Sequence, residues 1–277
     1  MDKLHLQKIA LEIRKGALTA VYTAASGHPG GSLGIAELLA YLYFEEMHVD
    51  PKNPKDPDRD RFVLSKGHTS PALYAALAEK GFFPKEDLKT FRQKDSYLQG
   101  HPDMKHIPGV DMSTGSLGQG ISAACGMALS GKISEKKYRV WTILGDGECE
   151  EGQVWEAAMF AAHYGLNNLC AFVDFNGLQI DGAVTEVMNP TPLDTKFAAF
   201  GWNTLVIDGH DFDQIASAVE AAKRSAKPTA VICKTTKGKG VSYMENQVAW
   251  HGSAPNQEQR DQAYAELQAV LNGLEEG

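Results

Sequence analysis

The stretch from Trp141 to Gly182 constrains the fold more than any other part of the chain. A β-prone run at 141–144 meets the turn Gly145-Asp146-Gly147, an apolar helix follows at 154–162, and a buried strand at 169–173 leads to Asn176. In such a parallel β-α-β unit both strands end at the same edge of the sheet. Asp146 and Asn176 are therefore predicted to lie side by side. A carboxylate and an amide oxygen suit Mg²⁺ or Ca²⁺ bound together with a phosphate.

Strands and helices alternate along the rest of the chain. Further strands are predicted at 61–65, 202–207 and 228–233, and helices at 4–25, 35–47, 70–80, 85–91, 121–130, 195–200, 212–222 and 257–271. This alternation predicts an α/β fold, a mostly parallel sheet with helices on both faces, as one domain over 1–277. The loop at 26–31 is too rich in Gly and Pro to continue a helix. The helix at 154–162 is expected to be covered on most sides.

Composition excludes several classes of protein. The chain has 277 residues, of which 43% are hydrophobic, which suffices for a large core. Its net charge of −8 argues against nucleic-acid binding. The amphipathic start is unlike a signal peptide and no apolar run is long enough for a bilayer, so a cytoplasmic protein without membrane contact is expected. The 4 cysteines form no CxxC pair and are expected to be reduced and mostly buried.

Four histidines stand in loop positions. His28, His68 and His101 each follow a glycine in a turn, and His251 precedes Gly252. One such histidine would be read as a surface or capping residue. Four of them in one α/β chain indicate a functional role, because loops at strand ends often hold catalytic and binding residues. Imidazole can exchange protons near neutral pH and can bind hydroxyls and phosphates. A zinc site is the alternative, but the spacings match no local zinc motif.

Taken together, these motifs resemble the transketolase family of thiamine diphosphate enzymes. GDG followed after about thirty residues by Asn is that family's signature for binding the diphosphate and the metal ion. The glycine-rich segment 114–120 matches neither of two other phosphate-binding motifs, GxGxxG and Walker A. The α subunits of 2-oxo acid dehydrogenases share GDG…N but not the histidine set. The resemblance covers nearly the whole chain through SGHPGGSLG at 26–34, VLSKGH at 63–68, GHPD at 100–103, TGSLGQG at 114–120 and WHG at 250–252.

The resemblance implies a metal and diphosphate site. Asp146 and Asn176 would ligate Mg²⁺ through side-chain oxygens and Leu178 through its backbone carbonyl, with Ca²⁺ or Mn²⁺ as alternative ions. The amide of Gly147 would approach the diphosphate, and His68 would hydrogen-bond it.

The same resemblance assigns the rest of the cofactor pocket. Gly115 and Leu117 would line the aminopyrimidine, and Ile180 would lie beneath the bent cofactor. Lys237 matches a lysine that some branches of the family place near the diphosphate. Ser116 departs from the proline of many members.

By resemblance, four residues are catalytic candidates. His28, His101 and His251 would face the substrate, bind its hydroxyls and assist proton transfers. Glu151 would contact the counterpart active site across a dimer interface. A first-turn acid stabilised by the helix dipole remains an alternative for Glu151.

Transketolases are more than twice as long as this chain, which resembles their first domain only. The pyrimidine domain, whose glutamate activates the cofactor, and the C-terminal domain are expected on a partner chain. The resemblance thus implies the N-terminal subunit of a split transketolase, active only with its partner, in a cytoplasmic two-plus-two heterotetramer. A truncated chain is the alternative. The helices at 121–130 and 154–162 are candidates for the interface.

The implied reaction moves a two-carbon ketol unit from a ketose phosphate to an aldose phosphate, as in the pentose phosphate pathway. Two alternatives stay open. One is a subunit of another thiamine diphosphate enzyme with a different sugar or oxo acid substrate, or of a synthase such as that of deoxyxylulose phosphate. The other is a cofactor-binding module without catalysis.

Overall fold

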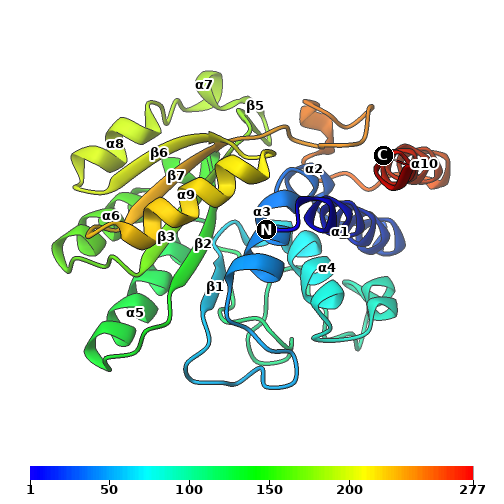
Figure 1. Cartoon of the computed structure of the whole chain (residues 1–277). Helices are drawn as coiled ribbons and strands as arrows, with labels where there is room; N and C mark the ends of the chain where they lie inside the picture. The colour runs from blue at the N-terminus through cyan, green and yellow to red at the C-terminus, as the bar shows by residue number, and fades with distance from the viewer. Residues whose placement is uncertain (277) are drawn as a thin grey trace.

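A five-stranded parallel sheet in the order β1-β2-β3-β7-β6 forms the middle layer of the computed structural model, which describes residues 1–276 (Figure 1). The predicted α/β architecture is confirmed. A two-stranded antiparallel hairpin follows β3 and was not predicted. The strands are β1 Arg61–Leu64, β2 Val140–Gly145, β3 Leu169–Phe175, β4 Leu178–Gln179, β5 Gly182–Ala183, β6 Asn203–Asp208 and β7 Thr229–Lys234.

Helices cover both faces of this sheet (Figure 1). The longer ones are α1 Lys3–Ala24, α4 Ser70–Lys80, α5 Gln119–Ile133, α6 Gly152–His163, α9 Phe212–Arg224 and α10 Gln257–Glu276. The shorter ones are α2 Pro29–Leu33, α3 Ala36–Tyr41, α7 Val184–Val187 and α8 Leu193–Ala199. A π-helical turn, Leu42–Glu46, continues α3, and 3₁₀ turns lie at Gly67–Thr69, Lys85–Thr90, Gly147–Glu150 and Val248–Trp250.

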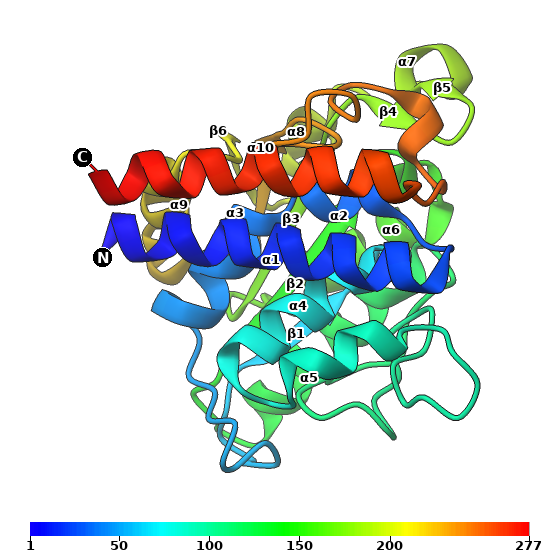
Figure 2. The same cartoon turned by 90° about the vertical axis from the view of Figure 1, so that its right-hand side faces the viewer.

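The alternation of side chains along the strands divides the core into two layers. Phe172 of β3 packs in the cluster that contains buried residues of α1, α3, α4 and α9. Its neighbour Val173 packs on the other face with residues of α5, α6 and α8. Because successive strand residues point to opposite faces, a strand buried on both sides is apolar throughout. The helix α10 lies along α1 (Figure 2), where Leu18 and Leu267 share a third cluster.

Two local predictions were wrong. The segment after α1 is not only a loop, because Pro29–Leu33 forms the short helix α2, in which proline occupies a first-turn position where it needs no hydrogen bond. The helix α6 is not covered on most sides. It buries Val154, Ala157, Ala158 and Ala161 and leaves two large apolar side chains exposed, Met159 and Phe160.

Two expectations about the chain's chemistry can be compared with this fold. All four cysteines are free and buried, as expected. Among residues 1–276, no helix has both the length and the apolar character needed to cross a bilayer.

A buried ionic network joins the helical layer to the end of the sheet. Arg14 of α1 donates two hydrogen bonds of 2.7 Å to the carboxylate of Glu37 in α3. The backbone N–H of Thr236 donates to Nε2 of His210, so the Nδ1 of that ring donates to Glu37 at 3.0 Å. Although burial opposes ionisation, the Arg14 charge and the His210 hydrogen bond lower the pKa of Glu37 to about 2.

Glu37→Gln is expected to remove a pH-dependent part of the stability. The pKa of Glu37 falls from 4.5 to about 2 on folding, so its contribution is complete above pH 4.5 and is lost as the pH falls through 2. Urea titrations at several pH values should show a free energy of unfolding that is lower in the variant by on the order of 3 kcal/mol at neutral pH. The gap should close toward pH 2. A gap independent of pH would contradict this role of Glu37.

Candidate active site

A cavity of about 300 Å³ opens at the carboxyl ends of β1, β2 and β3. That is the edge at which open parallel sheets bind ligands. Every predicted site residue lines this cavity except His101 and Glu151. Those that do are His28, His68, Gly115, Leu117, Asp146, Gly147, Asn176, Leu178, Ile180, Lys237 and His251. Loops distant in the sequence thus converge on one small space.

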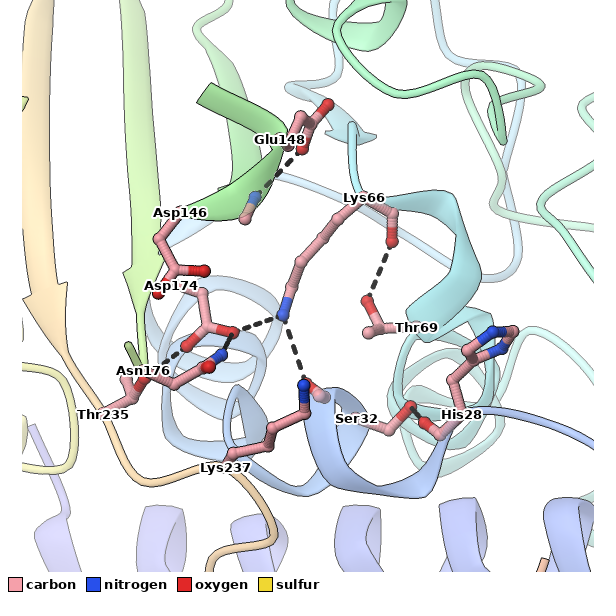
Figure 3. Close-up of polar contacts among 12 residues, drawn as sticks. His28, Ser32, Lys66, Thr69, Asp146, Glu148, Asp174, Asn176, Thr235 and Lys237 are labelled. Atoms are coloured by element: carbon pink, nitrogen blue, oxygen red, sulfur yellow. Dashed lines mark hydrogen bonds and ion pairs between the residues drawn. The ribbon is translucent and has the colours of Figure 1, made fainter. Parts of the chain in front are cut away.

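Asp146 and Asn176 follow the ends of neighbouring strands, as the β-α-β unit predicts. Asp146 is buried, and its carboxylate accepts hydrogen bonds from the backbone N–H of Gly147 at 2.8 Å and of Gly177 at 2.6 Å. Burial, and then the charge of Asp174, raises the pKa of Asp146 to about 6. The side chains of Asp146 and Asn176 lie on the same side of the cavity (Figure 3).

The carbonyl of Leu178, the third predicted metal ligand, already accepts from a cation. The Lys237 ammonium donates to it at 3.1 Å and lies 2.9 Å from Nδ1 of His251. Lys237 is buried, and burial together with the charge of Lys66 lowers its pKa to about 8. A positive charge is therefore accommodated beside this carbonyl.

Three imidazoles form another wall. The ring centroid of His28 lies 5.1 Å from that of His68 and 5.4 Å from that of His251, and the His68 and His251 centroids are 5.4 Å apart. Burial lowers the pKa of His28 and of His251 to about 4 and that of His68 well below its usual value. The rings are neutral at physiological pH and can each donate and accept a hydrogen bond. The buried Nδ1 of His28 has no hydrogen-bond partner in the described structure.

The alternative of a zinc site can be compared with this geometry. Within the part of the chain that the structure describes, no three His, Cys, Asp or Glu side chains are placed to hold a metal ion. The set of Asp146, the amide of Asn176 and the Leu178 carbonyl is of another kind, because it offers oxygens only. Hard oxygen ligands suit Mg²⁺, Ca²⁺ or Mn²⁺ rather than zinc.

Two predicted residues stand outside the cavity. His101 is exposed, and its ring packs against Gly115, where an added Cβ would come within 3.0 Å of it. Glu151 is exposed at the start of α6, and its side chain makes no capping hydrogen bond. Its aliphatic part packs on Gly118, so it lies near the cavity's loops without entering the cavity.

Sequence reasoning missed three buried charged residues that hold the cavity together: Lys66, Glu148 and Asp174. Lys66 and Asp174 form an ion pair of 2.5 Å. All three occur next to quoted motifs, in VLSKGH, directly after GDG and two positions before Asn176. For Asp174 the available signal was a charged residue near the end of an otherwise apolar strand.

Glu148 connects three segments of the wall. One carboxylate oxygen accepts from the Ser65 hydroxyl at 2.5 Å and from the Gly118 N–H at 2.9 Å, and the other accepts from the Gly145 N–H at 2.9 Å. Gly118 has a φ of +81°, which a glycine adopts without strain, and precedes α5. The loop at 114–118 is thereby fixed to the ends of β1 and β2.

The residues present fit a divalent cation with a diphosphate. The donor set is a carboxylate, an amide oxygen and a carbonyl that already binds an ammonium group. Lys237, beside the Leu178 carbonyl, and the unpaired Nδ1 of His28, in the wall of imidazoles, supply further hydrogen-bonding capacity. The cavity volume lies at the lower end of the range for ligand pockets.

Comparisons with known proteins agree with this site. Residues 6–268 match the family described as "Transketolase, thiamine diphosphate binding domain". The chain is 50% identical over 268 residues to the 6-deoxy-6-sulfo-D-fructose transketolase subunit SqwG of Clostridium sp. and covers 98% of it. It is 41% identical to a subunit of the apulose-4-phosphate transketolase of Phocaeicola vulgatus and covers 93% of that subunit.

Longer relatives match this chain over less than half of their own length. The chain is 43% identical to mouse transketolase and spans 42% of it. The crystal structure of Campylobacter jejuni transketolase superposes with a TM-score of 0.91 at 34% identity, over 99% of this chain and 46% of that one. The chain belongs to the transketolase family and corresponds to its thiamine diphosphate binding domain.

Proposed function

We propose that the chain is the N-terminal subunit of a two-chain transketolase that moves a two-carbon ketol unit between sugars. The observation that carries the proposal is the oxygen donor set of Asp146, Asn176 and the Leu178 carbonyl at the sheet edge, in a chain that matches the family over 6–268. Two relatives that this chain matches almost end to end are named as transketolase subunits.

The proposed cofactors are thiamine diphosphate and Mg²⁺. Asp146, Asn176 and the Leu178 carbonyl would hold the metal ion, and Gly147, His68 and Lys237 would contact the diphosphate. When bound, thiamine diphosphate supplies a thiazolium ring that acts as an electron sink. Gly115 and Leu117 would contact the aminopyrimidine. Ile180, which is 63% exposed at the cavity, would be covered by the cofactor.

The histidines would handle the substrate. His28 and His251 line the cavity as neutral rings, so each can accept a proton from a sugar hydroxyl and donate to another oxygen. His101 approaches Gly115 from outside the cavity and would meet the substrate at its entrance. All three assignments follow the family resemblance, and the position of His28 and His251 in the cavity lining supports theirs.

A partner chain would complete the enzyme. It would bring the pyrimidine domain with the activating glutamate and the residues that grip the substrate's anionic end. The exposed apolar side chains Met159 and Phe160 on α6 and Ile133 at the end of α5 support such an interface, because large exposed apolar groups mark contact surfaces. Glu151, exposed nearby, would contact the counterpart site. We propose a cytoplasmic heterotetramer of two such pairs.

Two substrate classes are proposed for this site. The family resemblance favours ketose and aldose phosphates, as in the pentose phosphate pathway. The relative with 50% identity is named for 6-deoxy-6-sulfo-D-fructose, which favours a sulfonated ketose as the second candidate donor. Both donors carry an anionic end, and the groups that recognise it would lie on the partner.

Ketol transfer is expected only when both subunits are present. The test mixes this chain with a second chain that carries the pyrimidine domain and measures transfer from a ketose phosphate and from the sulfonated ketose. Neither chain should be active by itself, because the cofactor's activating glutamate and its metal ligands lie on different chains. Activity of this chain without the other would contradict the shared site, and inactivity of the mixture with both donors would contradict the function.

A further inference from the structure

Both carboxylate oxygens of Asp174, the buried residue near the end of β3, accept hydrogen bonds from the protein. The Thr235 hydroxyl donates to Oδ1, and the Lys66 ammonium and the Asn176 amide donate to Oδ2 at 2.5 Å and 2.9 Å. The side chain is fully buried, so no solvent competes for these bonds. The ion pair with the Lys66 ammonium and the two further donors hold this side chain as a carboxylate inside the wall.

This arrangement fixes the orientation of the Asn176 amide. A carboxylate only accepts hydrogen bonds, so the atom of Asn176 next to Asp174 must be the NH₂ group. The backbone N–H of Leu178 only donates, so the atom that meets it at 3.1 Å must be the oxygen. The chain itself therefore determines which atom of Asn176 is available as an oxygen ligand.

Lys66 completes the arrangement from the other side of the cavity. It follows β1, and its buried side chain crosses to Asp174 beside the cavity (Figure 3). The ammonium also donates to the carbonyl of Gly31 in α2 at 3.2 Å. Because Lys66 neutralises Asp174, the cavity wall presents the carboxylate of Asp146 without a competing free carboxylate from β3.

We propose that Lys66 and Asp174 are positioning residues of this site. The pair holds the amide of Asn176 with its oxygen available to a divalent cation and leaves Asp146, not Asp174, as the ligating carboxylate. This inference rests on the proposed function. Neither residue is assigned contact with the substrate or the metal ion.

The test measures Mg²⁺ affinity of the full-length chain in the presence of thiamine diphosphate, by calorimetry. Lys66→Met with Asp174→Leu removes both charges, so it avoids an unpaired buried ion. It also removes the acceptor that orients Asn176. The expected result is an apparent Kd for Mg²⁺ that is roughly 10- to 100-fold larger, which is the effect of losing partners that orient metal ligands.

Lys66→Met with Asp174→Asn separates orientation from charge. The introduced asparagine can accept from Asn176 through its oxygen and donate to Thr235 through its nitrogen. Affinity should then recover toward the wild-type value. Asp174→Ala replaces the leucine substitution if the larger side chain prevents folding, because it removes the same acceptor.

The matched control is Arg14→Met with Glu37→Gln, which removes another buried ion pair whose residues do not line the cavity. Its thermal stability should change as the test variant's does, while its Mg²⁺ affinity stays that of wild type. A Kd of the Lys66→Met, Asp174→Leu chain equal to that of wild type would overturn the inference alone. Absence of Mg²⁺-dependent cofactor binding in wild type would overturn the proposed function and the inference with it.

Discussion

Asp146→Ala is expected to abolish Mg²⁺-dependent binding of thiamine diphosphate while the chain stays folded. Removing a ligating carboxylate should cost more than the roughly 100-fold loss that follows removal of a partner behind a ligand. The fold should persist because Asp146 is a buried carboxylate whose pKa burial raises, so its charge does not stabilise the folded chain. Removing the buried charge therefore favours folding, but the N–H groups of Gly147 and Gly177 lose their acceptor, which partly offsets this gain.

Calorimetric titration with Mg²⁺ and thiamine diphosphate, beside thermal denaturation, checks this expectation. Asp181→Ala is the control, because Asp181 is exposed in the same hairpin region and does not line the cavity. It should bind as wild type does. Wild-type affinity in the Asp146→Ala chain would remove Asp146 from the set of ligands.

Glu148→Gln is expected to lower both stability and cofactor affinity, although the two side chains have almost the same shape. Three donors face the two carboxylate oxygens, from Ser65, Gly118 and Gly145. In either orientation the glutamine NH₂ meets a backbone N–H, of Gly118 or of Gly145, so a buried donor loses its acceptor. The free energy of unfolding should fall by about 1–3 kcal/mol.

The cofactor affinity of the Glu148→Gln chain should fall together with its stability, because Glu148 fixes the loop at 114–118 and the end of β2 relative to each other. Urea denaturation and cofactor titration give the two values. Glu156→Gln, an exposed change on α6, is the control and should alter neither. If Glu148→Gln unfolds at the same urea concentration as wild type, the carboxylate does not have this connecting role.

The sequence predicted the layers of this fold because strands buried on both faces are apolar throughout. The run at 169–173 was predicted as a buried strand, and it forms β3, which the structure places in the middle of the sheet. The same reasoning failed for α6, since an apolar residue such as Phe160 gives the same pattern whether it faces the core or the surface. The pattern of apolar residues shows which face of a helix is hydrophobic, but not whether another part of the chain covers that face.

The sequence predicted which residues offer metal ligands at the cavity, but not which buried charged residues hold the cavity wall in place. Asp146 and Asn176 follow strand ends, where topology alone brings them together. Lys66 and Asp174 are 108 positions apart in the sequence, and nothing in their local pattern says that one neutralises the other. The role of Glu148 could not be predicted either, because its hydrogen-bond partners come from three separate segments. Contacts of this kind depend on the assembled fold.

The location of the divalent cation tests the central claim most directly. A crystal of the chain grown with Mn²⁺ and thiamine diphosphate should give one anomalous peak at the cavity, with oxygens of Asp146, Asn176 and Leu178 at roughly 2.0–2.3 Å. Lys237 should then have left the Leu178 carbonyl that it contacts in this structure. A peak among the imidazoles of His28, His68 and His251, or none in the cavity, would contradict the account.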